Sequence, residues 1–322
     1  MRVVRVHAFG GREALRLDEL PTPEPGPNEV RASVAAAGLN FIDVYHRIGL
    51  YKLPLPLRLG IEGAGTVEAV GSSVRDVAVG DRIAWVQVQG SYATHALVPA
   101  ERAVKLPEGM GFRDGAALFE HGMTAHYLSH STYAVKSGDT CLVHAAAGGV
   151  GALLVQLAKL RGARVIGTVS SEAKERRARE AGADEVIRYT EVDFESEVRR
   201  LTGGKGVNAV YDGVGKTTFL KSLGSLAPRG MLVWYGQASG PPDPFDPLLL
   251  MQKGSLYLTR PSLVHYSSTR EEYQERARAV LDLYASGKLR LRIDRTFPLE
   301  QAAAAHAAAE SRETMGKVLL IP

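Results

Sequence analysis

Hydrophobic and polar positions alternate over short runs through the first hundred residues. This alternation is typical of strands with one buried face. It predicts strands at Val3–His7, Glu29–Ala36, Gly65–Val70, Arg82–Val86 and Tyr92–Val98. Between them lie a proline-rich loop at residues 21–27 and glycine turns at residues 71–73 and 80–81. Short strands joined by such closely spaced turns and loops predict a compact, partly antiparallel β domain.

The pattern changes near Gly115, where alanine-rich helical segments begin, and from Gly138 onward strand-like and helix-like segments alternate strictly. This order is typical of a doubly wound α/β domain with a parallel sheet. The predicted strands are Thr140–Ala145, Arg164–Val169, Glu185–Arg188, Val207–Tyr211 and Gly230–Tyr235. The predicted helices are Val150–Arg161, Glu172–Ala181, Phe194–Leu201 and Thr217–Leu226.

The last third of the chain is more mixed. A Gly/Pro-rich stretch is followed by predicted strands at Ser255–Arg260 and Val318–Ile321 and by predicted helices at Arg270–Ser286 and Ala302–Ala309. We expect this tail to return to the first domain. A chain of 322 residues exceeds the size that one hydrophobic core usually serves, so two domains are expected.

Composition and charge exclude several classes of protein. Hydrophobic residues make up 45% and charged residues 23%, which indicates a globular chain. The net charge is only +4 and no basic block stands out, so a nucleic-acid partner is not expected. No segment is a membrane-span or signal-peptide candidate, which favours a cytoplasmic location. The single cysteine, Cys141, lies in an apolar run where burial is expected, and it excludes multi-cysteine zinc sites.

The segment Val143–Gly151 carries the strongest functional signal. Its sequence, VHAAAGGVG, runs from a predicted strand directly into a predicted helix. Backbone N–H groups and the helix dipole can bind a pyrophosphate there, and small residues let the backbone approach it. We therefore expect Ala147, Gly148, Gly149 and Val150 to contact a dinucleotide. A glycine-rich turn without a nucleotide is the alternative.

The end of the second strand indicates which nucleotide is bound. NAD-binding proteins place Asp or Glu there, whereas this chain has Ser170 and Ser171, with Lys174 in the next helix. Hydroxyl groups and an ammonium favour a 2′-phosphate, so NADPH is the predicted cofactor. Simple helix capping by the serines is the alternative, and Glu172 could replace the missing acid.

With these features in place, the whole chain resembles the zinc-free quinone oxidoreductases of the medium-chain dehydrogenase/reductase superfamily, which include zeta-crystallin. The most specific match is the string from Gly138 to Lys159, centred on Ala146-Ala147-Gly148-Gly149-x-Gly151. The resemblance implies a Rossmann cofactor domain at residues 120–258. A GroES-like, partly antiparallel catalytic domain at residues 1–119 would be completed by residues 259–322. It also implies a homodimer formed through edge strands near Gly230–Tyr235 and Ser255–Arg260.

Two positions that resemble zinc-ligand positions of alcohol dehydrogenases carry Asn40 and Ile61, so no metal site is expected. Without a Lewis acid, reduction of a conjugated acceptor by hydride remains available. The predicted function is NADPH-dependent reduction of a quinone. An NADPH-dependent reductase of enones or 2-enoyl thioesters is the main alternative, and an RNA-binding or crystallin-type protein is a third.

The resemblance also implies individual site residues. Asn40, Asp43 and Tyr51 match the segment that lines the nicotinamide site, although Asn40 and Asp43 could instead be cap residues, or Asp43 a surface charge. Implied cofactor contacts are Thr124, Tyr189, Tyr235, Gly236, Arg260 and Lys317. An interface salt bridge is the alternative for Arg260. His144, inside a predicted strand, is expected to be a hydrogen-bonded core residue.

Overall fold

The computed structural model describes all 322 residues, which divide into two compact units. The first unit contains Met1–His121, Ser267–Tyr284 and Leu291–Pro322. The second contains Gly122–Tyr266 and Ala285–Arg290. Most of the C-terminal tail therefore belongs to the first unit. The predicted division into a catalytic and a cofactor domain stays a prediction.

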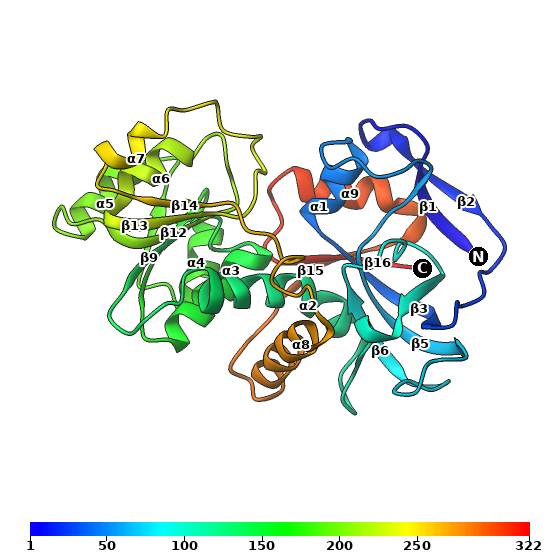
Figure 1. Cartoon of the computed structure of the whole chain (residues 1–322). Coiled ribbons are helices and arrows are strands. Elements are labelled where there is room, and N and C mark those ends of the chain that lie inside the picture. The colour runs from blue at the N-terminus through cyan, green and yellow to red at the C-terminus, as the bar shows by residue number, and fades with distance from the viewer. The chain divides into compact units, whose positions relative to one another are not determined.

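The first unit is built mainly from antiparallel strands (Figure 1). A seven-stranded sheet has the order β15-β16-β3-β5-β6-β8, with β7 paired to β3, and a three-stranded sheet has the order β2-β1-β4. Only β15 and β16 pair in parallel. The strands are β1 (Arg2–Val6), β2 (Leu15–Glu19), β3 (Glu29–Leu39), β4 (Leu57–Arg58), β5 (Glu62–Val70), β6 (Arg82–Val86), β7 (His95–Pro99), β8 (Val104–Lys105), β15 (Ile293–Pro298) and β16 (Lys317–Ile321).

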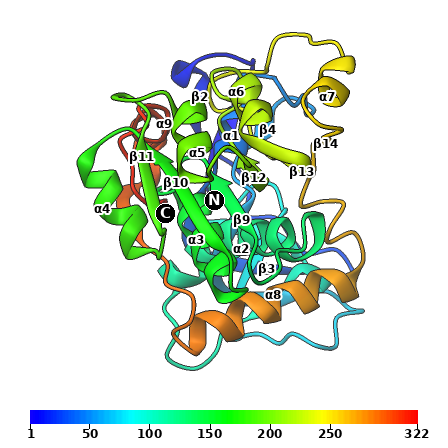
Figure 2. The same cartoon turned by 90° about the vertical axis from the view of Figure 1, so that its left-hand side faces the viewer.

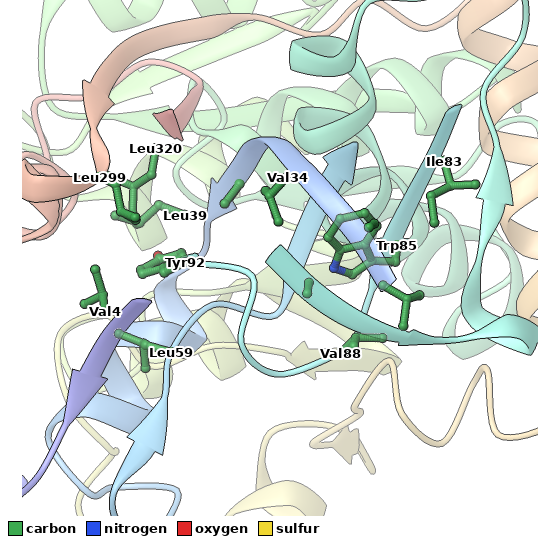
Figure 3. Packing of buried hydrophobic residues seen from close by; sticks show 14 of the residues in the cluster. Val4, Val34, Leu39, Leu59, Ile83, Trp85, Val88, Tyr92, Leu299 and Leu320 are labelled. Atoms are coloured by element: carbon green, nitrogen blue, oxygen red, sulfur yellow. The ribbon is translucent and has the colours of Figure 1, made fainter. Parts of the chain in front are cut away.

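The core of the first unit lies between these sheets and helix α9 (Ala302–Glu310). Figure 3 shows Leu39, Tyr92, Leu299 and Leu320 gathered at one end of this core, while Trp85 lies toward the other. Each large apolar side chain buried in this way stabilises the fold by about 1.5–3 kcal/mol. The other helices are α1 (Phe41–Arg47), α8 (Arg270–Ala285) and α2 (Phe112–Tyr127), whose last turns enter the second unit; three short 3₁₀ helices lie at Arg12–Ala14, Ala100–Arg102 and Leu299–Gln301.

The second unit contains one parallel sheet of six strands. Its order is β11-β10-β9-β12-β13-β14, and the strands follow one another from left to right in Figure 2. The strands are β9 (Thr140–Val143), β10 (Arg164–Val169), β11 (Glu185–Arg188), β12 (Val207–Asp212), β13 (Leu226–Trp234) and β14 (Tyr257–Thr259). Numbered by their order along the chain, they follow 3-2-1-4-5-6, the arrangement of a Rossmann fold, which confirms the predicted doubly wound domain.

Helices connect the strands of this sheet and cover both of its faces (Figure 1). They are α3 (Gly149–Leu160), α4 (Glu172–Glu180), α5 (Phe194–Leu201), α6 (Phe219–Ser225) and α7 (Leu248–Gln252), and a π-helical turn at Leu128–Thr132 follows α2. Helix α3 packs against α4, and α5 packs against α6. No helix of the structure is both long enough and apolar enough to span a membrane.

The structure differs from the predicted elements mainly in the first unit and in the tail. Strands β2 and β15 were not predicted, because most of their residues are charged or partly exposed and no clean alternation results. The predicted strand at Tyr92–Val98 is wrong in its first three residues. The backbone of Tyr92 instead bonds Val4 and Leu59, and regular pairing in β7 begins only at His95.

Candidate functional site

In the second unit, the turn between β9 and α3 has the shape that the sequence predicts. Ala145 has a positive φ of 51°, and its carbonyl accepts a hydrogen bond from the N–H of Gly148 at 2.8 Å. Gly148 is the extended N-cap of α3. A Cβ at Gly151 would lie 2.2 Å from the Ala145 oxygen, so only glycine lets the helix begin this close to the turn.

This helix start can bind an anion. The first N–H groups of a helix have no carbonyl acceptor one turn earlier. Gly148, Gly149 and Val150 are partly exposed, whereas the side chain of Ala147 is buried. The N–H of Gly148 is already donated to Ala145, so those of Gly149 and Val150 are the donors left for an anion, and no acidic residue lies in the first turn of α3 to repel a phosphate.

The end of β10 brings the predicted 2′-phosphate residues together. The Lys174 ammonium donates to the Ser170 hydroxyl at 3.3 Å. Ser171 is the N-cap of α4, and its hydroxyl accepts from the Lys174 N–H at 3.4 Å, so the capping interpretation holds for Ser171. Glu172 is exposed and forms an ion pair with Arg176 on the same helix. Its carboxylate is therefore already partnered in this structure.

Further predicted cofactor residues follow the carboxyl ends of two other strands of the sheet, β11 and β13. Tyr189 comes directly after β11; its side chain is 46% exposed and its N–H bonds the carbonyl of Val169. Tyr235 and Gly236 follow β13, and both of their N–H groups donate to the carbonyl of Asp212. Because the strands are parallel, their carboxyl ends lie on the same side of the sheet. These residues therefore lie at the same end of the strands as the turn before α3.

Two more predicted residues lie elsewhere in the second unit. Arg260 follows β14 and lies over the ring of Trp234, 4.9 Å from its centroid, so a cation–π contact holds its guanidinium. Thr124 is buried in α2. The structure therefore gives Arg260 a partner within its own unit.

In the first unit, Asn40 and Asp43 form the start of α1. Asn40 is the N-cap, and its backbone N–H donates to Asp43 Oδ2 at 2.9 Å. The Tyr92 hydroxyl donates to the same oxygen at 3.0 Å. Asp43 is fully buried, so the alternative of a surface charge is wrong and that of a helix cap holds.

The side chain of Asn40 is fixed by a buried ion pair. Its amide nitrogen donates to the Gly38 carbonyl at 3.2 Å and to Glu62 Oε2 at 3.1 Å, while its oxygen accepts from Lys317 at 2.6 Å. Lys317 in turn pairs with Glu62, and both side chains are at most 1% exposed. Both amide protons of Asn40 are thus donated inside the unit. A Cβ at Gly38 would lie 2.4 Å from Glu62, so glycine is needed for this approach.

Two carboxyl groups near this ion pair have unusual acidity. Burial raises the pKa of Asp43 to about 7, against the hydrogen bonds from Asn40 and Tyr92. Burial and the charge of Glu62 raise the pKa of Glu120 to about 8. Each group has one buried oxygen without a hydrogen-bond partner, Oδ1 of Asp43 and Oε2 of Glu120. The first unit therefore holds protonatable carboxyl groups close to the Asn40 site.

Sequence reasoning missed Glu62, Glu120 and Tyr92. Glu62 and Lys317 are separated by 255 positions, so their pairing has no local signal. The acidic residue inside the apolar, glycine-rich stretch at residues 60–65 was the one available sign that Glu62 would need a buried partner.

Tyr51 lies just after α1 and is 36% exposed. Its ring packs edge-on against Tyr45, with centroids 5.3 Å apart, and contacts His46. Phe41 extends this aromatic row from the first turn of α1. Tyr45 and His46 are buried, so Tyr51 is the exposed end of this aromatic row.

The remaining candidates have other roles. His144 is buried and hydrogen-bonded at both ring nitrogens, as predicted for a core histidine, and Cys141 is a buried free thiol. No group of three or more His, Cys, Asp or Glu side chains is arranged to hold a metal ion.

Known protein families match most of the chain. The alcohol dehydrogenase GroES-like domain matches residues 26–108, and the zinc-binding dehydrogenase domain matches residues 149–286. A quinone oxidoreductase from Pseudomonas aeruginosa is 46% identical over 321 residues, which cover 99% of both chains. A 2-haloacrylate reductase from Burkholderia sp. is 44% identical over 326 residues, 98% of both chains.

The fold is also similar to solved structures. The Escherichia coli quinone oxidoreductase complexed with NADPH has a TM-score of 0.98 and 42% sequence identity, with all of both chains covered. Likeness therefore extends over the full length of the chain in both sequence and structure.

Proposed function

The chain belongs to the quinone oxidoreductase family of the medium-chain dehydrogenase/reductase superfamily, and we propose that it reduces a quinone with NADPH and without zinc. The observation that carries this proposal is the end of β10, where Ser170 and Lys174 stand in place of a carboxylate. A similar protein has been solved with NADPH bound, which supports the same cofactor for this chain.

The donor set of the second unit fits this cofactor. The backbone at residues 147–150 would bind the pyrophosphate, and Ser170 and Lys174 would bind the 2′-phosphate. Tyr189 and Tyr235, which follow β11 and β13, would lie at the same carboxyl end of the sheet. When bound, NADPH supplies the hydride.

The first unit contributes polar groups of fixed orientation. Asn40 serves as a positioning residue, because both of its amide protons are already donated and none remains for a substrate. Asp43 holds the backbone of Asn40 from the first turn of α1. The exposed ring of Tyr51 is the proposed contact for an aromatic acceptor or for the nicotinamide.

The side chains available support zinc independence. Asn40 is engaged with Lys317 and Glu62, and the ammonium of Lys317 already neutralises Glu62. The chain has no cluster of metal-binding side chains, so we expect hydrogen bonds to polarise the acceptor and the geometry of the site to orient it. Chelators should therefore leave turnover unchanged.

A second candidate is reduction of an activated alkene. The 2-haloacrylate reductase, at 44% identity, is named for such a substrate. Quinones and activated alkenes are both conjugated acceptors that take hydride, so one scaffold can serve either. Steady-state assays with a matched panel of quinones, enones and 2-haloacrylate would rank the two functions directly.

The cofactor proposal is tested by Lys174→Ala. Loss of the ammonium should lower kcat/KM for NADPH about tenfold, because a hydrogen bond to a charged group contributes about 1.5–3 kcal/mol. The value of kcat/KM for NADH should stay unchanged. Arg176→Ala is the control, since this neighbouring cation is exposed and paired with Glu172. Equal losses with both nucleotides, or a wild-type preference for NADH, would reject NADPH as the cofactor.

A further inference from the structure

A line of buried polar side chains crosses the second unit beneath the carboxyl ends of its strands. It consists of Thr168 near the end of β10, His144 just after β9, Ser222 on α6 and Asp212 at the end of β12. All four are at most 1% exposed. We call these four residues the histidine network. None of these side chains is among the predicted catalytic or cofactor-binding residues.

The hydrogen bonds of this network run in one direction. Asp212 accepts from the hydroxyls of Ser222 at 2.9 Å and Thr218 at 2.7 Å. Since the proton of Ser222 is donated to Asp212, its oxygen must accept from His144 Nε2, 3.0 Å away. The other ring nitrogen, Nδ1, then accepts from the Thr168 hydroxyl at 2.8 Å. Burial lowers the pKa of His144, which agrees with a neutral ring carrying one proton.

Three members of the network adjoin segments that face the proposed cofactor. His144 directly precedes Ala145, whose carbonyl holds the start of α3 through Gly148. Thr168 lies two residues before Ser170. The other oxygen of Asp212 accepts the N–H groups of Val214 and Gly215 and so fixes the turn after β12.

We propose that the histidine network is a positioning device for the nucleotide. The hydrogen bond between His144 and Thr168, beside the backbone bond from the Ala146 N–H to the Thr168 carbonyl at 3.2 Å, sets the spacing between the pyrophosphate turn after β9 and the 2′-phosphate residues after β10. A nucleotide with two phosphates on its adenosine must fit both places at once, whereas one with a single 5′-phosphate uses only the first. The network therefore contributes to selectivity for the 2′-phosphate without touching it. This inference rests on the proposed function.

The test uses calorimetric titration of the whole protein with 2′,5′-ADP and 5′-AMP. Thr168→Val and Ser222→Ala should each weaken 2′,5′-ADP binding about five- to tenfold, the scale of coupling between contacting residues, while 5′-AMP affinity changes less than about twofold. Thr168→Ser keeps the hydroxyl group and should bind 2′,5′-ADP with wild-type affinity. Ser225→Ala is the matched control, because this buried hydroxyl of the same helix bonds only the Lys221 carbonyl of its own helix.

Thermal unfolding of every variant separates positioning from damage to the fold. Unchanged 2′,5′-ADP affinity in folded Thr168→Val and Ser222→Ala would overturn the network's role while leaving the cofactor proposal intact. The network's role would also be overturned if the two variants lost affinity equally for 2′,5′-ADP and 5′-AMP, or if Ser225→Ala lost as much 2′,5′-ADP affinity as they do. If the wild-type chain bound neither 2′,5′-ADP nor NADPH, the proposed function would fail first and the network's role with it.

Discussion

Lys317 is a buried cation that balances one carboxylate and orients one amide, so its removal has a specific cost. In Lys317→Met the charge of Glu62 stays buried without its partner, and a loss of about 3–5 kcal/mol in the free energy of unfolding is expected. Urea unfolding measures this loss. Adding Glu62→Gln to Lys317→Met should recover part of it.

The control for this prediction is Lys159→Met. Lys159 pairs with Asp184, but both side chains are about one-third exposed, so at most about 1 kcal/mol should be lost. A similar loss in the two lysine variants would mean that the buried pair contributes no more than a surface pair.

The raised pKa values of Asp43 and Glu120 predict how stability depends on pH. Both groups bind a proton more tightly in the folded than in the unfolded chain, so their contribution is complete at low pH and declines as pH rises. For Asp43 the decline spans its ordinary value of 3.8 to about 7, and for Glu120 it spans 4.5 to about 8. Denaturant unfolding of Asp43→Asn combined with Glu120→Gln should show a flatter profile from pH 4 to about 8 than the wild type.

Asp81 provides a control of opposite sign. Its pKa is lowered by the hydrogen bond from Lys105, so its contribution is present at neutral pH and is lost as pH falls through its ordinary range. Asp81→Asn should leave the slope between about pH 5 and 8 as in the wild type. If the double variant of Asp43 and Glu120 kept the wild-type slope, ionisation of these two groups would not be the cause.

At the level of elements, the start of α3 depends on the absence of a side chain at Gly151. A methyl group there would lie 2.2 Å from the Ala145 carbonyl oxygen, so the helix and the turn must separate. Gly151→Ala should therefore lower the melting temperature and weaken NADPH binding at least about fivefold, since clashes in a packed interior cost about 1–3 kcal/mol. Nucleotide fluorescence titration and thermal unfolding measure both effects.

Gly111→Ala is the matched substitution. An added Cβ there would meet only Asp114, at an ordinary 3.6 Å, so stability and NADPH affinity should stay close to wild type. Wild-type binding by Gly151→Ala would show that α3 can shift without disturbing the phosphate turn.

The sequence predicted the second unit better than the first for a physical reason. In the second unit β9, α3 and β10 are apolar and follow one another directly along the chain, so they could be placed from short patterns. In the first unit β2 and β15 carry charged, partly exposed residues, so neither has a clear alternation of apolar and polar positions; pairing with β1 and β16 makes them strands.

The same distinction applies to the candidate site. The turn at Gly148 and the contact between Ser170 and Lys174 are short-range features, so their residues could be singled out from the sequence. The partnership of Glu62 with Lys317, and that of His144 with Ser222, join residues 255 and 78 positions apart. Only folding brings such groups together, and no pattern of spacing along the chain records it.

At the scale of the whole molecule, the order of the six-stranded sheet limits how two copies could join. Strand β13 is paired on both sides, by β12 and by β14, so of the two strands expected at a dimer interface only β14 has an unpaired edge. Tyr257 on β14 is 58% exposed, and Met251 at the end of α7 is 59% exposed. An unpaired edge with apolar neighbours is suited to pairing with the same strand of a second chain.

The predicted homodimer should therefore depend on β14. Tyr257→Lys places a charge on this edge, where charged side chains oppose pairing, and should shift the chain toward a monomer at micromolar concentration. Light scattering after size-exclusion chromatography measures the mass. Val192→Lys is the control. It changes an exposed apolar residue that follows β11, the strand at the opposite edge of the sheet, and should leave the dimer intact. A monomeric wild type, or a dimer lost in Val192→Lys but kept in Tyr257→Lys, would exclude assembly through β14.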